Sequence, residues 1–191
     1  IIGGKAFDTH HHTYVMGILN ITPDSFSDGG CYMGLDLARW QAEKMICEGA
    51  DLIDIGGEST RPGYKRITDE EEIARILPVI EMLKKEYAIP VSVDTYKSKV
   101  AEAAAEAGAD MINDIWGLRA DPDMAGVVAR HEMALCLMHN KTQPVYEDLI
   151  QDCLRDLSGS IDIALKAGID PDRIILDPVV GFSKNLEENL N

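Results

Sequence analysis

The sequence lacks long apolar runs and has little positive charge. No segment reaches the roughly 18 apolar residues that a membrane span requires, and the chain does not open with the pattern of a secretory signal. Its 191 residues include 33 acidic and 18 basic side chains, so the net charge at pH 7 is -15. Such a charge excludes nucleic acid and anionic membrane surfaces as expected partners, because both repel an acidic chain. An anionic substrate would need a metal ion or a local basic patch.

Cysteines are few and scattered along the chain. The C-x-x-C pattern of a zinc or redox site is not formed by any of Cys31, Cys47, Cys136 and Cys153. Apolar neighbours around Cys136 indicate a reduced core thiol, which favours a reducing cytoplasm. His10–His12 have no cysteine or carboxylate at ligand spacing, so we interpret them as a solvated segment rather than a metal site.

No linker of biased composition divides the chain, and we expect one domain over residues 1–191. Gly49 and Gly108 each follow an expected helix and precede an expected strand, within the related segments Glu48–Asp54 and Ala107–Asn113. This recurrence is typical of βα units in a parallel sheet. Apolar runs predict strands at 14–20, 51–57, 90–94, 111–113, 133–138 and 174–176, and helical spacing predicts helices at 35–48, 70–86, 98–107 and about 146–167.

Polar residues stand where most of the expected strands end, namely Asn20, Asp94, Asn113, His139 and Asp177. Parallel strands place these ends on one rim, so the pattern predicts a ligand site there. No G-x-G-x-x-G follows the first strand, and the polar ends are not confined to one switch point, which argues against an open doubly wound sheet. We therefore predict an α/β fold of the TIM-type (β/α)8 barrel class, with about six units present and the last two missing.

Two carboxylates and an amide among these ends suit a heterocyclic ligand. A carboxylate at a barrel centre is costly unless donors meet its oxygens. Asp94, Asn113 and Asp177 could accept from an amino group beside a ring N–H. A structural network with backbone amides or arginine remains the alternative for each of them.

Two polar loops are further candidates. Residues 20–30 carry Phe26, which could form an apolar wall over a substrate. Residues 56–63 carry Thr60 and Arg61, whose donors suit phosphate. An ordinary surface loop and a tight connection are the respective alternatives.

Two other features have simpler interpretations. His139 either lines the pocket or only hydrogen-bonds within the rim. The acidic run Asp69–Glu72 is interpreted as a helix N-terminus that complements the helix dipole.

Six segments, in order along nearly the whole chain, are similar to one known family. They are Met16–Gly30, Gly49–Gly63, Val91–Thr95, Ile112–Ile115, Met138–Asn140, and Leu176–Pro178 with Gly181 and Phe182. The first two are highly specific. On these segments the chain resembles dihydropteroate synthase, the folate-pathway family targeted by sulfonamides.

The resemblance implies a TIM-type barrel that joins 6-hydroxymethyl-7,8-dihydropterin diphosphate to p-aminobenzoate, releasing pyrophosphate and 7,8-dihydropteroate. It implies that Asn20 lies beside the Mg²⁺ that holds the diphosphate. We also expect a homodimer. The residues that the resemblance assigns to substrates are Thr60, Asp94, Asn113 and Asp177, with Phe26 and Pro62 enclosing p-aminobenzoate.

The chain departs from the family pattern in two places. It stops at Asn191, before the family's seventh and eighth strands, which carry a lysine that contacts pterin and an Arg/His pair that binds phosphate. Val179 stands where the family usually has glycine, and a side chain there is expected to alter the backbone near the pocket. Two alternatives stay open: the pterin-binding barrel of a methyltetrahydrofolate methyltransferase, and a non-catalytic pterin-binding fragment. The loops with Phe26 and with residues 59–63 favour the synthase.

Overall fold

The computed structural model describes residues 1–21, 30–59, 66–142, 145–180 and 182–190. Within them the chain alternates strands and helices as the sequence predicts. The strands are β1 (Met16–Asn20), β2 (Leu52–Gly56), β3 (Val91–Asp94), β4 (Met111–Asp114), β5 (Ala134–Met138) and β6 (Ile174–Asp177). The helices are α1 (Gly30–Cys47), α2 (Asp69–Glu86), α3 (Ser98–Glu106), α4 (Met124–Arg130), α5 (Leu149–Lys166), the 3₁₀ turn η2 (Pro171–Arg173) and α6 (Leu186–Leu190).

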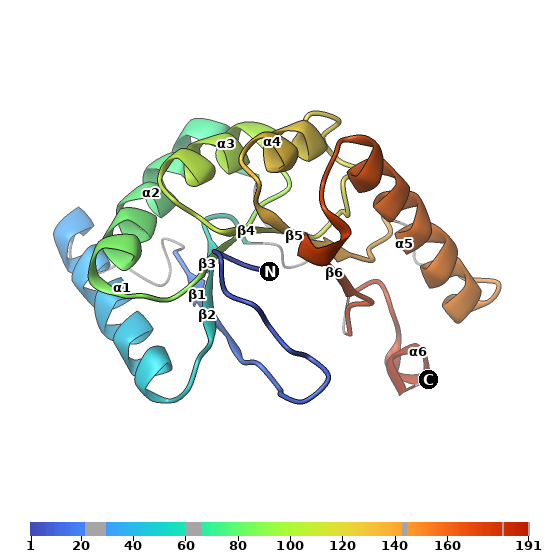
Figure 1. Ribbon diagram of the computed structural model, residues 1–191, viewed down its shortest axis with the longest axis horizontal. Helices are drawn as coiled ribbons and strands as arrows, with labels where there is room; N and C mark the ends of the chain where they lie inside the picture. The colour runs from blue at the N-terminus through green and yellow to red at the C-terminus, as the bar shows by residue number, and fades with distance from the viewer. Residues whose placement is uncertain (22–29, 60–65, 143–144, 181, 191) are drawn as a thin grey trace.

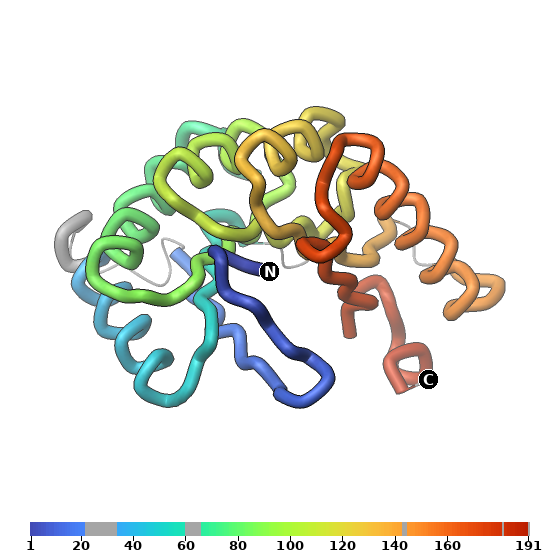
Figure 2. Tube along the Cα trace, in the orientation of Figure 1, coloured from blue at the N-terminus to red at the C-terminus, as the bar shows by residue number. Residues whose placement is uncertain are grey.

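The six strands form one parallel sheet in the order of the sequence, β1 to β6. A doubly wound sheet would reverse its strand order at a switch point, and no reversal occurs among these strands. Figure 1 shows α1 to α5 as an arc around the sheet. In the view of Figure 2, the N-terminal segment and α6 lie on the side away from this arc. The prediction of a barrel-type arrangement with about six βα units is therefore confirmed.

Alternation along the strands separates two apolar layers. Ile53 and Ile55 of β2 are fully buried in the large core between the sheet and the helices, with Ile76 and Ile80 of α2. Leu52 belongs instead to a smaller cluster that includes Met111 and Cys136, with Ile2 from the N-terminal segment. Because side chains alternate along a strand, Asp54 shares the inner face with Leu52. Asp54 therefore lies on the side of the sheet that carries this smaller cluster, opposite the large core under the helices.

Helix α2 shows how the local sequence sets the helix ends. The Thr68 hydroxyl accepts from Glu71 N at 3.2 Å, and the first turn is entirely acidic. Lys84 and Lys85 lie in the last turn, so both ends complement the helix dipole. Of the described helices, none is long and apolar enough to cross a membrane.

Two helices were not predicted. Helix α4 has seven residues and no side-chain cap hydrogen bond, and α6 has five residues. Segments this short give too few turns for an apolar period to stand out.

The outer strands of the sheet predict self-association of the 191-residue chain. Strands β1 and β6 each pair with one neighbour among the described strands, and Ile18 and Leu176 are 59% and 46% exposed. Exposed strand edges and apolar side chains promote pairing between chains. We expect light scattering to show dimers or larger species, and Ile18→Lys to reduce them. A stable monomer at high concentration would contradict this prediction.

Candidate functional site

Strand register aligns three of the predicted polar residues in one row. Asn20 pairs with Gly56, Gly56 with Asp94, and Asp94 with Asn113. A Cβ added to Gly56 would lie 3.0 Å from Asn20 Oδ1 and 3.9 Å from Asp94 Oδ2. Glycine at position 56 therefore lets the Asn20 side-chain oxygen lie close against β2, near the Asp94 carboxylate at the carboxyl ends of the strands.

Asp177 stands at the end of β6. Its neighbour in the sheet is Met138, while Cys136 of β5 pairs with Asn113. Burial raises the pKa of the Cys136 thiol to about 12, and the charges of Asp177 and Asp94 add to the effect. Both carboxylates thus act on one buried sulfur. Asn113 is thus the neighbour of Cys136 in the sheet, and the charges of Asp94 and Asp177 both act on the Cys136 thiol. Contact of the three residues with a ligand stays a prediction.

Two buried oxygens in this row lack a partner among the described residues. They are Asp94 Oδ1 and Asn113 Oδ1. Burial raises the pKa of Asp94 well above its usual range, and the charges of Asp54 and Glu72 raise it further. A buried acceptor without a donor costs about 1–3 kcal/mol, more when it is charged. A ligand that presents N–H donors here would remove this cost, which is the strongest indication of a binding site in the structure.

Asp54 is a member of the site that the sequence interpretation missed. It is 3% exposed and accepts from Ser92 Oγ at 2.5 Å and from Asn113 Nδ2 at 3.2 Å. Burial raises the pKa of Asp54, while both hydrogen bonds oppose the rise. Because the Asn113 nitrogen is held by Asp54, the Asn113 oxygen is left as an acceptor. The sequence does contain an indication of this role. Asp54 stands two residues before Gly56, so its side chain lies on the same face of the strand as position 56.

A second buried cluster joins the ends of the segment between β2 and α2. Lys97 Nζ lies 2.8 Å from Glu58 Oε2, 2.7 Å from Glu72 Oε2 and 2.9 Å from the Ile67 carbonyl oxygen. Ile67 N also donates to Glu58 Oε2 at 3.0 Å. Burial acts against both charges, yet the ion pairs lower the pKa of Glu58 and raise that of Lys97. The interpretation of residues 69–72 is therefore incomplete, because Glu72 is a buried ion-pair partner as well as a helix N-terminal acid.

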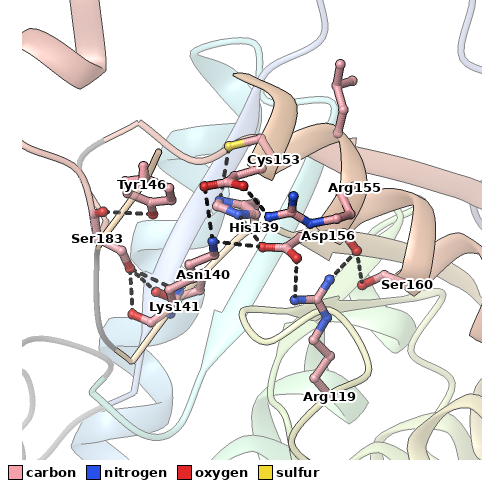
Figure 3. Close-up of polar contacts among 12 residues, drawn as sticks. Arg119, His139, Asn140, Lys141, Tyr146, Cys153, Arg155, Asp156, Ser160 and Ser183 are labelled. Atoms are coloured by element: carbon pink, nitrogen blue, oxygen red, sulfur yellow. Dashed lines mark hydrogen bonds and ion pairs between the residues drawn. The ribbon is translucent and has the colours of Figure 1, made fainter. Parts of the chain in front are cut away.

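His139 hydrogen-bonds within the rim, which decides between its two interpretations. Its Nε2 lies 3.2 Å from Asp156 Oδ2, and its Nδ1 lies 3.3 Å from both Cys153 Sγ and Lys184 Nζ. Figure 3 shows His139 beside Cys153 and Asp156. Burial lowers the pKa of His139 and raises that of the Cys153 thiol, so both groups are neutral near pH 7. This arrangement supports α5 against β5 and gives no activated thiolate.

Val179 occupies a backbone conformation that suits glycine. Its φ is 56°, and its N–H donates to Asp177 Oδ1 at 2.7 Å. A β-branched residue in the left-handed region is strained. The departure from the family pattern therefore lies in the turn that binds the Asp177 carboxylate.

The strain at Val179 predicts an unusual order of stabilities. Val179→Ala and Val179→Gly remove similar packing, but only glycine relieves the left-handed strain, so Val179→Gly should be more stable by about 1 kcal/mol. Urea denaturation of both variants measures the difference. As a control, Ala105→Gly within α3 should cost about 1 kcal/mol, because glycine is unfavourable in a helix. Equal stability of the two Val179 variants would contradict the strain.

Several predicted residues lie outside the described part of the chain. Phe26, Thr60, Arg61 and Pro62 belong to segments 22–29 and 60–65. Their predicted contacts with substrates are not tested by the structure. By contrast, residues 10–12 are exposed, as the interpretation of a solvated segment requires.

Comparisons with known proteins agree on one family. Residues 16–191 match the family described as pterin binding enzyme. Dihydropteroate synthase of Clostridium beijerinckii is 54% identical over 99% of this chain and 70% of its own length. The Bacillus subtilis dihydropteroate synthase is 55% identical over 97% of this chain and 65% of its own length. The chain thus spans about two thirds of these relatives.

Solved structures give the same result. Dihydropteroate synthase from Clostridium difficile, determined in the presence of pteroic acid, superimposes with a TM-score of 0.93 at 47% identity, covering 97% of this chain and 71% of that one. The Yersinia pestis enzyme in a sulfonamide complex has a TM-score of 0.90 at 43% identity, covering all of this chain and 71% of its own. The sequence and structural agreement extends over nearly the whole chain, and Asn20, Asp94 and Asn113 stand at the strand ends as the resemblance requires. The chain therefore belongs to the dihydropteroate synthase family of pterin-binding enzymes.

Proposed function

We propose that this chain binds the dihydropterin diphosphate substrate of dihydropteroate synthase and condenses it with p-aminobenzoate. The observation that carries the proposal is the pair of unpartnered buried acceptors, Asp94 Oδ1 and Asn113 Oδ1, beside Asp54. A pterin ring has an amino group next to ring N–H groups, and such donors match these acceptors. The relatives reported above are all dihydropteroate synthases, which favours this reaction over methyl transfer.

The raised pKa of Asp94 gives binding a pH dependence. In the free chain, burial and the neighbouring carboxylates favour the protonated form of Asp94. An N–H donor from the ring stabilises the ionised form instead. Pterin affinity should therefore rise as the pH increases through the folded-state pKa of Asp94.

Asn20 fits the magnesium ion that the resemblance implies. Its Oδ1 lies close to Gly56 at the strand ends, and an amide oxygen is a hard ligand of the kind that Mg²⁺ prefers. The described residues contain no group of three His, Cys, Asp or Glu side chains that could hold a metal. One protein oxygen agrees with an ion bound mainly by substrate phosphates and water. When bound, Mg²⁺ would neutralise charge on the departing diphosphate.

The chain itself contributes position and electrostatics. Asp94, Asn113 and Asp177 orient the pterin so that its methylene carbon lies toward Asn20 at the strand ends. Loss of diphosphate leaves positive character on that carbon, and the carboxylates of the pocket favour this charge. The amine of p-aminobenzoate then attacks this carbon and loses a proton, so that a new C–N bond replaces the C–O bond that broke when diphosphate left.

Two measurements test the proposed function together. Calorimetry with 6-hydroxymethyl-7,8-dihydropterin diphosphate and Mg²⁺ reports binding, and an assay of pyrophosphate reports turnover. Release of pyrophosphate that depends on p-aminobenzoate supports the enzyme. Binding without release supports the non-catalytic pterin-binding alternative, and the absence of binding would contradict both.

We also propose a homodimer in the cytoplasm. The reduced, buried thiols of Cys136 and Cys153 suit a reducing compartment. The oligomeric state can be measured by sedimentation of the purified chain.

A further inference from the structure

The turn that follows β6 contains two residues in a backbone conformation that L-amino acids rarely adopt. Val179 has a φ of 56°, and Ser183 has a φ of 53°. Neither residue is glycine, so both conformations are strained, and strained backbone persists only where its surroundings hold it. Such strain concentrates at functional sites. Asp177, which the resemblance assigns to pterin, begins this turn, and its Oδ1 accepts from Val179 N at 2.7 Å.

The far end of the turn is held by the segment that follows β5. Tyr146 Oη donates to the Ser183 carbonyl oxygen at 2.9 Å, and Lys141 N donates to Ser183 Oγ at 3.2 Å. Ser183 Oγ also bonds to Asn140 Oδ1. Figure 3 shows these bonds meeting at Ser183. The strained conformation of Ser183 is therefore fixed from outside the turn.

Lys184 connects the end of the turn to a buried histidine. Its Nζ lies 3.3 Å from His139 Nδ1 and 3.4 Å from the Phe182 carbonyl oxygen. His139 is 2% exposed, and burial lowers its pKa, so the ring is neutral near pH 7. Its Nε2 lies 3.2 Å from Asp156 Oδ2, and a carboxylate only accepts, so Nε2 carries the proton. Nδ1 is left as an acceptor, which Lys184 and the Cys153 thiol share.

The same histidine is joined to the start of the turn. His139 N donates to the Asp177 carbonyl oxygen at 2.9 Å, which continues the pairing of β5 with β6 beyond Met138. Burial lowers the pKa of Lys184, and the negative charge of Asp177 opposes this shift, so the two side chains lie within electrostatic range. The backbone of His139 thus fixes one end of the turn, and its side chain fixes the other.

We propose that His139 and Lys184 are positioning residues that hold the Asp177 carboxylate in place for pterin. Helix α5 fixes the His139 ring through Asp156, the ring binds Lys184, and Lys184 holds the strained turn that begins at Asp177. Both residues act through Asp177 rather than on the ligand. Because Asp177 is oriented before the ring arrives, binding spends less free energy on ordering it. The inference rests on the proposed function, since it requires Asp177 to contact pterin.

Lys184→Met tests the turn in the chain without ligand. Hydrogen exchange measured by NMR reports the Val179 N–H, which is bonded to Asp177 Oδ1. Loss of the Lys184 bond to His139 should make this N–H exchange at least about tenfold faster, because the turn then opens more often. The N–H groups inside β5 should exchange as before. Lys166→Met, at an exposed side chain in the last turn of α5, is the matched control and should change neither rate.

A double-mutant cycle tests whether Lys184 acts through Asp177. Calorimetry uses 6-hydroxymethyl-7,8-dihydropterin, whose lack of diphosphate excludes a direct effect of the lysine charge on phosphate. Lys184→Met should weaken binding about tenfold, the loss expected for one bond from a charged donor. In an Asp177→Asn background it should have no further effect. An equal loss in both backgrounds would show that Lys184 acts elsewhere and would overturn the proposal.

Tyr146→Phe is a milder second variant that removes only the hydroxyl bonded to Ser183. It should make the Val179 N–H exchange about fivefold faster, as expected for one neutral hydrogen bond. Unchanged Val179 exchange in both Lys184→Met and Tyr146→Phe would overturn the proposal. If exchange responds as expected but the unaltered chain does not bind pterin, the proposed function fails, and the role of Lys184 in holding Asp177 stands.

Discussion

Asp94→Asn is expected to remove most of the pterin affinity while making the folded chain more stable. The carboxylate has one buried oxygen without a partner, and its pKa is raised by burial and by Asp54. Two charge-assisted hydrogen bonds to a ligand contribute about 3 kcal/mol together, so their loss should lower affinity about a hundredfold. The amide removes a buried charge, which should add about 1–2 kcal/mol to the free energy of unfolding near pH 8.

The gain in stability should depend on pH. The folded-state pKa of Asp94 lies above its unfolded-state value, so the unaltered chain loses stability as the pH rises between them. Asp94→Asn lacks this loss, and the difference between the two proteins should vanish at low pH. Calorimetric titration and urea denaturation measure the two effects. Asp36→Asn, at a 75% exposed side chain, serves as the matched control and should change neither. An Asp94→Asn protein that binds pterin normally, or is less stable near pH 8, would contradict the assignment.

Lys97→Met should cause the largest loss of stability of any single change considered. The side chains of Glu58 and Glu72 are 4% and 2% exposed, and Lys97 lies within 2.8 Å of both. Removing one partner of a buried ion pair costs about 3–5 kcal/mol, because charge is left buried without compensation. We expect a loss of about 3 kcal/mol near pH 8, measured by urea denaturation. Lys99→Met, at a 76% exposed side chain, should be close to neutral.

The same variant should recover part of its stability in acid. Burial raises the pKa of Glu72 even beside Lys97, and without Lys97 the pKa of Glu58 should also rise above its unfolded-state value. Their destabilising charge is then relieved as the pH falls toward about 4.3, the ordinary pKa of glutamate. Adding Glu72→Gln to Lys97→Met should also restore stability, which a double-mutant cycle quantifies. A pH-independent loss would show that packing, rather than charge, explains the effect of Lys97.

The sequence was sufficient to predict the sheet and its polar rim. Apolar runs that end in Asn20, Asp94 and Asn113 follow directly from strands that are covered on both faces and open at their carboxyl ends. Parallel register then places these residues in a row without any information about distant contacts. Local sequence was therefore enough to predict which residues share one edge of the sheet.

The buried charges could not be predicted in the same way. Glu72 follows three other acids at a helix start, and only its contact with Lys97 distinguishes it from them. Asp54 depends likewise on Ser92 and Asn113, which lie 38 and 59 residues away. The resemblance to a family marked Val179 as a departure from glycine, but its positive φ is visible only in the structure. Tertiary partners, rather than local propensity, decide each of these positions.

A crystal structure of this chain with 6-hydroxymethyl-7,8-dihydropterin would test most directly whether separate strand ends form one pterin pocket. The ring should lie with its N–H groups about 2.7–3.2 Å from Asp94 Oδ1 and Asn113 Oδ1, against the inner face of the sheet. A ring bound elsewhere, with both oxygens still unpartnered, would contradict the assignment of this rim to pterin.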